Sequence, residues 1–405
     1  MAGNLYALST LGSIIGTFLT VFVLIPTLDL RSIIFALGLS LMVSSIMGVR
    51  RIGKALFIIT LITITFPLSG VLQNLYVHAG NVIYEKETFY NHLDVVDRDS
   101  LRTLYLNGLP HGAMYLNGSN NLVFPYTRLF HLAYAFNPNF KEVLFVGGGS
   151  FSGPKSFLES YPHVRIDVVE IDSDVIRVAQ EYFNIKPNSR LQIFNDDARN
   201  FLRNSEKKYD VIVLDAYSKT YIPFHLMTKE FFFLLYDRLA PNGVIVSNII
   251  ASLVGDTSNI LRAQYKTLQS LFPKVYLFPV SSEISRVQNV MVVALKEILI
   301  REEELNSLLS NSNIPYRNEL KKYLNNVYQF QHTAANLEDI PILTDDYAPV
   351  ENLINPITGK PYSPQDEANM NQSLEINYNS PIAFSILISV ALVWGINLFE
   401  YSKRN

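Results

Sequence analysis

Uncharged apolar stretches lie at both ends of the chain. They cover residues 5–28, 32–49, 55–73 and 381–399. A helix needs about 20 mostly apolar residues to cross the hydrocarbon core of a bilayer. Three successive stretches without a basic leader or a clear cleavage site also argue against one cleaved signal peptide. We therefore predict an integral membrane protein of the cell membrane, with about three transmembrane helices in residues 1–78. Residues 379–405 supply one more helix and a basic tail; buried core helices are the alternative.

The basic residues near these stretches leave the orientation open. Arg50, Arg51 and Lys54 lie between the second and third stretches, and Lys403 and Arg404 follow the last. The positive-inside rule places both clusters in the cytoplasm. Counting spans then puts the large central region outside, unless the third stretch does not fully cross. The side of the membrane on which the central region lies is therefore not predicted.

Residues 79–138 change to short runs in which apolar and polar residues alternate, such as HLDVVD, TLYLNG and AMYLNG. The Asn-Gly pairs at 107–108 and 117–118 are typical of two-residue hairpin turns. We predict a small β-rich subdomain in this part of the chain.

Residues 139–300 alternate apolar strands with helical segments. The expected strands cover residues 142–149, 165–172, 191–197, 209–216 and 243–250. Near-continuous Val, Ile and Leu runs indicate strands buried on both faces, as in a parallel sheet covered by helices. Residues 274–280 and 287–295 are close enough to pair as an antiparallel hairpin at the sheet edge. We predict an α/β, Rossmann-like, doubly wound sheet of the methyltransferase type, followed by a C-terminal extension in residues 301–378.

Glycines and acids at the ends of the first two strands predict a nucleoside site. Gly147, Gly148 and Gly149 follow the first strand, where they let the backbone turn sharply and approach a ligand. Glu170 ends the second strand, 21 residues after the last glycine (170 − 149), a spacing that suits a carboxylate accepting ribose hydroxyls. Asp172 joins this set, although a helix N-cap is its stronger alternative.

Acids also end the third and fourth strands. Asp196, Asp197 and Ala198 follow the third, where a carboxylate can accept the adenine amino group; a helix cap is the alternative for Asp197. Asp215 ends the fourth strand beside the expected reactive end of the ligand, where it could take a proton from an amine. A capping or merely solvated aspartate is the alternative there.

Composition excludes several classes of function. The net charge of −3 argues against a nucleic-acid partner, because binding phosphates needs clustered Lys and Arg. The chain contains no cysteine, so a disulfide framework, a thiolate zinc site and a cysteine nucleophile are excluded. We expect no metal.

From about Tyr90 to about Lys296 the sequence resembles the spermidine synthase family of polyamine aminopropyltransferases, and specifically its membrane-fused members. The resemblance rests on VLFVGGG, VVEID, DDARNFL, YDVIVLDAYS and TKEFFFLLYDRLAPNGVIV; LTDDYAPVENL at 343–353 resembles a C-terminal extension of such proteins. It implies transfer of an aminopropyl group from decarboxylated S-adenosylmethionine to a diamine such as putrescine. By analogy it also allows a homo-oligomer.

The resemblance implies roles for residues on each side of the site. Glu170 would hold the ribose, Asp197 the adenine, and Asp215 would deprotonate the attacking amine. The residues implied to line the amine groove are Tyr90, Asn91, Tyr217 and Ser218.

Two departures from the family pattern keep other functions open. Ser150 stands where the family has an aspartate that contacts the amine of the donor, and Ser218 stands where a second acid is expected. Asp345 and Asp346 could compensate for the missing carboxylates, or form a solvated turn. A methyltransferase that uses S-adenosylmethionine itself and a non-catalytic nucleoside-binding module are therefore the alternatives.

Overall fold

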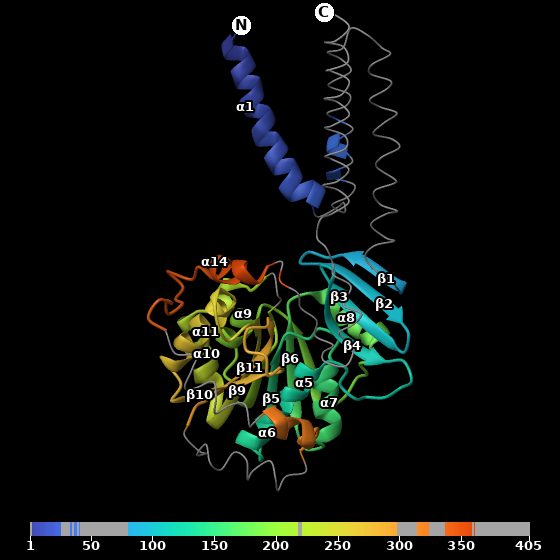
Figure 1. Cartoon of the computed structure of the whole chain (residues 1–405). Coiled ribbons are helices and arrows are strands. Elements are labelled where there is room, and N and C mark those ends of the chain that lie inside the picture. The colour runs from blue at the N-terminus through green and yellow to red at the C-terminus, as the bar shows by residue number, and fades with distance from the viewer. Residues whose placement is uncertain are drawn as a thin grey trace, which may run out of the picture. The chain divides into compact units, whose positions relative to one another are not determined.

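The computed structural model describes residues 2–25, 33–34, 36–38, 40, 80–217, 221–297, 314–323, 337–358 and 360. The chain divides into two compact units (Figure 1). One comprises Met1–Ala79, Glu85–His92 and Ile376–Asn405, and the other comprises Gly80–Tyr84 and Leu93–Glu375.

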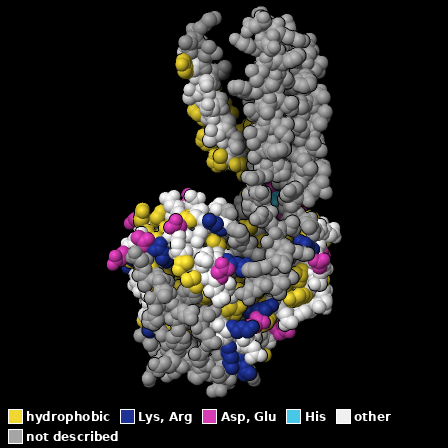
Figure 2. Space-filling view, viewed as in Figure 1, with side chains coloured by type: hydrophobic (Ala, Val, Ile, Leu, Met, Phe, Trp, Pro, Cys, Tyr) yellow, Lys and Arg dark blue, Asp and Glu magenta, His cyan; other side chains and the backbone are white. Residues whose placement is uncertain are grey.

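In the first unit, helix α1 (Ala2–Leu19) continues into a π-helical turn, η1 (Thr20–Leu24). Large apolar side chains such as Ile14, Phe18 and Phe22 are exposed along it (Figure 2). Among the residues described, no helix combines the length and the apolar character needed to cross a membrane. The predicted membrane stretches 55–73 and 381–399 lie outside the described residues, as does 32–49 apart from residues 33–34, 36–38 and 40.

A four-stranded sheet of order β1-β2-β3-β4 confirms the β-rich part predicted before the central domain. Its strands are β1 (Asn81–Glu87), β2 (His92–Arg98), β3 (Leu101–Leu106) and β4 (Leu109–Tyr115). Asn107 and Gly108 join β3 to β4 with φ of 52° and 74°, as the predicted hairpin turn requires. The second predicted hairpin, at Asn117-Gly118, was wrong. There the Asn117 side chain accepts from Ser119 N in a local turn after β4, and no strand follows directly in the described chain.

The central domain is built on a seven-stranded sheet of order β10-β11-β9-β8-β5-β6-β7. Strands β5 to β9 run parallel, and β10 and β11 form an antiparallel hairpin at one edge, as predicted. The strands are β5 (Glu142–Val146), β6 (Arg165–Glu170), β7 (Leu191–Asn195), β8 (Tyr209–Leu214), β9 (Leu239–Ala251), β10 (Lys274–Pro279) and β11 (Gln288–Leu295).

Helices cover both faces of this sheet, which explains the apolar strands. In β5, Val143 and Phe145 pack into one core, while Leu144 and Val146 pack into the other. The first core contains side chains of α5 (Pro125–Arg128), η2 (Leu129–His131), α6 (Leu132–Phe136) and α7 (Ser152–Ser160). The second contains side chains of α9 (Ala198–Asn204), α10 (Lys229–Arg238) and α11 (Asn259–Gln269). Helix α8 (Ser173–Tyr182) packs Val175 and Val178 against β2 and β3, and Ala179 into the first core.

Residues 337–358, which we call the C-terminal strap, lie across α10 and α11 and include α14 (Val350–Ile354) and η5 (Asn355–Ile357) (Figure 1). Lys266 Nζ of α11 donates to the carbonyl oxygens of Leu337 and Ile340, each at 2.6 Å. Lys229 N at the start of α10 donates to Leu343 O at 2.8 Å. Leu343 itself is fully buried, so the strap completes the core on this face of the sheet.

Candidate functional site

The glycine loop follows β5 at the point where the chain order of the sheet reverses, between β5 and β8. Gly147 has φ of +92°, and a Cβ there would overlap the carbonyl oxygen of Asp215. Gly149 has φ of +52°, and a Cβ there would lie 3.0 Å from the carbonyl oxygen of His111. Open α/β sheets bind ligands at this reversal point, outside the carboxyl ends of the strands. The glycines therefore bring backbone close to the place where a ligand is expected.

Glu170 ties the glycine loop to the end of β6. Its Oε2 accepts from Gly148 N at 2.8 Å, and its Oε1 accepts from Asp172 N at 3.0 Å. Burial raises the pKa of this carboxyl group, and the two backbone hydrogen bonds oppose that shift. Each carboxylate oxygen retains lone pairs for another donor. The predicted contact of Glu170 with ribose hydroxyls is compatible with this geometry and stays a prediction.

Asp172 takes the alternative role that its position in the sequence allowed. It is the N-cap of α8, where its side chain accepts from Asp174 N at 3.0 Å. It is only 2% exposed. The structure thus gives Asp172 a capping role and leaves little of it open to a ligand.

Asp197 is also a helix N-cap, but it has a second partner. Its Oδ1 accepts from Asn200 N at 3.0 Å at the start of α9, and its Oδ2 lies 3.0 Å from His225 Nε2. Burial raises the pKa of Asp197, but the hydrogen bonds from Asn200 and His225 outweigh it and leave the pKa lowered. Asp196 accepts from Asn200 Nδ2 at 2.8 Å, and Ala198 is buried in the first turn of α9. Asp197 is thus held as a carboxylate at the edge of the sheet.

Asp215 is a predicted site residue whose carboxyl pKa lies far from its ordinary value. It directly follows β8, where its Oδ1 accepts from Asn248 Nδ2 at 2.9 Å and its Oδ2 accepts from Tyr126 OH at 3.5 Å. Burial raises the pKa of Asp215 to about 6, against the opposing effect of these two hydrogen bonds. A partly buried carboxylate with its pKa close to neutrality can exchange a proton with a ligand at physiological pH.

Sequence reasoning missed the residues that hold Asp215. Asn248 lies on β9, and its Oδ1 accepts from Asn289 Nδ2 of β11 at 2.9 Å. Both asparagines are nearly fully buried, at 3% and 5% exposure. An amide inside an otherwise apolar strand, as in GVIVSNII and VQNVMVVAL, was the signal that could have identified them, because buried polar groups require partners.

The four residues predicted to line the amine groove have different surroundings. Tyr217 lies in the hydrophobic core, and its hydroxyl donates to Leu226 O at 2.7 Å. Ser218 lies outside the described residues. Tyr90 and Asn91 belong to the turn between β1 and β2, where Thr88 Oγ1 accepts from both of their backbone N–H groups. A role for Tyr90 and Asn91 in binding an amine stays a prediction.

Ser150 lies directly after the glycine loop and is buried, with 2% exposure. Within the described part of the chain its hydroxyl has no hydrogen-bond partner. A Cβ at residue 112 would overlap this hydroxyl, so Gly112 of β4 makes room for it. A neutral hydroxyl therefore stands where the family pattern suggested a carboxylate.

The two other acids suggested for the amine, Asp345 and Asp346, lie in the C-terminal strap. The Asp345 carboxylate forms an ion pair with Arg199 and accepts from Thr228 Oγ1 at 2.7 Å. Asp345 and Asp346 lie in an exposed turn closed by backbone hydrogen bonds between Thr344 and Tyr347, as the alternative predicted, and Asp345 also fastens this turn to the domain.

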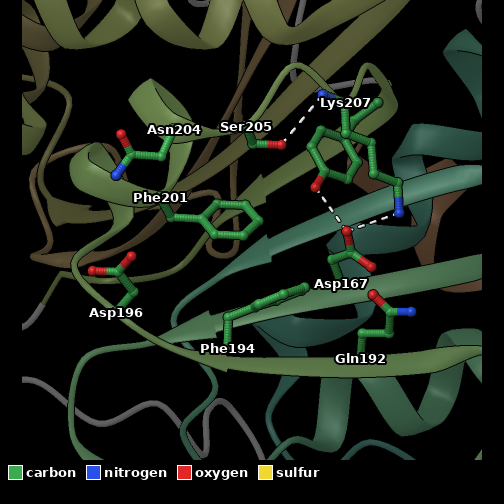
Figure 3. Close-up of a pocket in the computed structure, with 9 residues that line it drawn as sticks. Asp167, Gln192, Phe194, Asp196, Phe201, Asn204, Ser205 and Lys207 are labelled. Atoms are coloured by element: carbon green, nitrogen blue, oxygen red, sulfur yellow. Dashed lines mark hydrogen bonds and ion pairs between the residues drawn. The ribbon is translucent and has the colours of Figure 1, made fainter.

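A cavity of about 360 Å³ lies beside β6 and β7 (Figure 3). Phe194 and Phe201 line it, and Asp196 is the one predicted site residue on its wall. The buried Asp167 at its inner side already accepts from Lys207 Nζ at 2.8 Å and from Tyr209 OH at 2.7 Å. This cavity is therefore distinct from the group around Asp215 and the glycine loop.

Comparison with known proteins agrees with this arrangement. Residues 124–297 match the family model described as spermine/spermidine synthase domain. A polyamine aminopropyltransferase of Vibrio vulnificus is 28% identical over 295 residues, which cover 71% of this chain and 96% of that protein. A probable polyamine aminopropyl transferase of Bifidobacterium longum is 31% identical over 288 residues, which cover 67% of this chain and 62% of the length of that protein. The crystal structure of a probable spermidine synthase from Corynebacterium glutamicum has a TM-score of 0.51 at 21% identity, over 61% of this chain and 95% of that chain, and this likeness shows the fold alone.

Proposed function

We propose that this chain, whose residues 124–297 belong to the spermine/spermidine synthase family, transfers an aminopropyl group from decarboxylated S-adenosylmethionine to a diamine such as putrescine. The observation that carries the proposal is Asp215, a partly buried carboxylate with a pKa of about 6 at the reversal point of the sheet. A transferase of this class needs a base at that position, because an ammonium group cannot attack carbon until it loses a proton.

The reaction forms one bond and breaks another. The neutral amine nitrogen bonds to the donor carbon next to the sulfonium, and the bond from that carbon to sulfur breaks with its electron pair going to sulfur. Methylthioadenosine leaves, and the proton of the amine passes to Asp215 and then to solvent. Asn248 and Tyr126 each donate to one Asp215 oxygen, which fixes the direction in which its remaining lone pairs can accept.

The nucleoside end of the donor has matching groups on the neighbouring strand ends. In the proposed complex, the backbone of the glycine loop approaches the donor, Glu170 accepts from the ribose hydroxyls, and Asp197 accepts from the adenine amino group. The protein supplies position and proton transfer, since the sulfonium already makes the adjacent carbon electrophilic. The partial burial of Glu170 supports this placement, because a ligand hydroxyl would compensate the cost of keeping its charge from water.

The assay identifies the nucleoside that leaves. The full chain, purified in detergent, is incubated with decarboxylated or ordinary S-adenosylmethionine and a panel of diamines, and the products are identified by mass spectrometry. Methylthioadenosine together with an amine enlarged by one aminopropyl group supports the proposal. The matched pair of variants is Asp215→Asn and Asp210→Asn, because Asp210 lies in β8 itself, where its Oδ2 accepts from Lys141 N at 2.7 Å. Only the first should abolish turnover.

A methyltransferase is the second candidate, and Ser150 favours it. Its neutral hydroxyl carries no charge to attract the amine of a decarboxylated donor or to repel the carboxylate of ordinary S-adenosylmethionine. Release of S-adenosylhomocysteine in the same assay would support this candidate. Nucleoside binding without any product would leave a non-catalytic binding module.

We also propose that the chain is an integral membrane protein. The uncharged segment of α1 and η1, with exposed Ile14, Phe18 and Phe22, supports this, together with the three further apolar stretches in the sequence. Membranes from expressing cells are washed with alkaline carbonate, which removes peripheral proteins. Retention in the pellet supports the proposal, and complete release contradicts it. Protease accessibility of the central domain in sealed vesicles then decides on which side that domain lies.

A further inference from the structure

A series of polar contacts joins the C-terminal strap to Asp197. Asp345 of the strap pairs with Arg199 of α9, whose Nη1 lies 2.8 Å from Asp345 Oδ1. The same Nη1 donates to the carbonyl oxygen of His225 at 3.2 Å. The His225 ring in turn places Nε2 3.0 Å from Asp197 Oδ2. His225 lies in η3 (Phe224–Leu226), a short helix that begins nine residues after Asp215 (224 − 215).

The Arg199–Asp345 pair is built to fix geometry. The Arg199 side chain is 9% exposed, and both of its terminal nitrogens face the Asp345 carboxylate. Two parallel hydrogen bonds between a guanidinium and a carboxylate set orientation as well as distance. Asp345 is itself held, because its backbone N donates to Glu230 Oε2 at 2.9 Å and its carboxylate accepts from Thr228 Oγ1. The guanidinium is thus oriented from the strap and cannot turn away from His225 O without losing this pair.

We infer that Asp345 is a positioning residue for the nucleoside base. Through Arg199 it holds η3 in place, so that His225 fixes the Asp197 carboxylate toward the base. The inference rests on the proposed function, because it takes Asp197 as the acceptor of the adenine amino group. It gives the C-terminal strap a part in the nucleoside site in addition to its part in the core.

A second ion pair provides a matched control. Arg262 Nη1 of α11 lies 2.7 Å from Asp339 Oδ1, so this pair also fastens the strap to the domain. Like the first pair, it joins an arginine of a helix to an aspartate of the strap, but Arg262 donates further to Ser258 Oγ and Asn259 Oδ1 at the start of α11. If the strap only stabilises the domain, Asp345→Asn and Asp339→Asn should have the same kind of effect on ligand binding.

The test measures the affinity of both variants for methylthioadenosine by calorimetry, with the full chain in detergent. We expect Asp345→Asn to weaken binding about fivefold to tenfold, the effect of losing about one charged hydrogen bond. Asp339→Asn should stay within about twofold of the unsubstituted chain. In turnover assays Asp345→Asn should raise KM for the nucleoside donor while kcat changes little. Equal affinity of Asp345→Asn and the unsubstituted chain, or equal weakening by both variants, would overturn the inference alone.

A second pair of variants avoids disturbing the strap. His225→Ala should weaken methylthioadenosine binding to a similar extent, and His225→Gln should largely restore it, because the glutamine amide can donate where Nε2 does. Unchanged affinity in His225→Ala would contradict the inference. If the unsubstituted chain binds no methylthioadenosine, the proposed function fails and the inference fails with it, which separates the two results.

Discussion

Replacing Asp215 by asparagine removes a negative charge that the fold partly buries, so it should stabilise the protein while abolishing its activity. The pKa of Asp215 is raised from its ordinary 3.8 to about 6, mainly by burial. The folded state therefore holds this proton more tightly than the unfolded chain does. Protonation of Asp215 therefore stabilises the folded state fully below pH 3.8, and this stabilisation is lost as the pH rises through about 6.

The size of the effect follows from that difference. About two pH units, at about 1.4 kcal/mol for each, correspond to about 3 kcal/mol of lost stability once Asp215 is ionised. Asparagine has nearly the same shape and keeps one oxygen for Asn248 to donate to. Asp215→Asn should thus raise the free energy of unfolding by at most about 3 kcal/mol near pH 7.5, and by progressively less toward pH 4. Turnover should fall at least about a hundredfold, the usual contribution of a general base.

The assay is urea unfolding of both proteins in the same detergent at several pH values between about 4 and 8. Asp210→Asn serves as the control, because it removes another carboxylate of β8, one that accepts from the backbone N–H groups of Lys141 and Glu142. Two results would refute the reasoning: a loss of stability in Asp215→Asn near pH 7.5, or a gain that is the same at every pH. Either result would mean that ionisation of Asp215 does not destabilise the folded state.

Three further predictions concern the groups around Asp215 and the glycine loop. Because the hydrogen bond from Asn248 lowers the pKa of Asp215, Asn248→Ala should move the acidic limb of the pH–rate profile to higher pH, and an unmoved limb would contradict this. Glu170→Ala should weaken nucleoside binding by about 1–3 kcal/mol in calorimetry, and unchanged affinity would exclude its ribose contact. Gly147→Ala should reduce both turnover and thermal stability, because a Cβ at φ of +92° meets the carbonyl oxygen of Asp215; a fully active variant would show that the loop has room there.

The sequence predicted the central domain well for a physical reason. Residues such as Val143 and Leu144 point to opposite faces of β5, and both faces are covered, so the strand is apolar throughout and easily recognised. The positions of Glu170 and Asp215 at strand ends followed from the same pattern. The partners of Asp215 did not, because Tyr126 and Asn248 reach it only through tertiary contacts.

The less accurate predictions came from short sequence patterns that are compatible with two different structures. An aspartate after a strand and before a helix can bind a ligand or cap the helix, and the structure shows Asp172 as a cap. An Asn-Gly pair makes a hairpin only if a partner strand follows, which holds for Asn107 and not for Asn117. Tyr217 follows Asp215 so closely that its packing into the core could not be read from spacing.

The C-terminal strap also bears on how the chain reaches its native state during synthesis. The strap emerges from the ribosome long after the sheet it covers, yet Leu343 and Ile357 complete one of the two cores and Asp345 neutralises the nearly buried Arg199. A nascent chain that ends after β11 would therefore expose apolar surface over α10 and α11 and keep an arginine without its native counterion. A fragment that keeps this core covered therefore extends beyond the last strand of the sheet, to the end of η5.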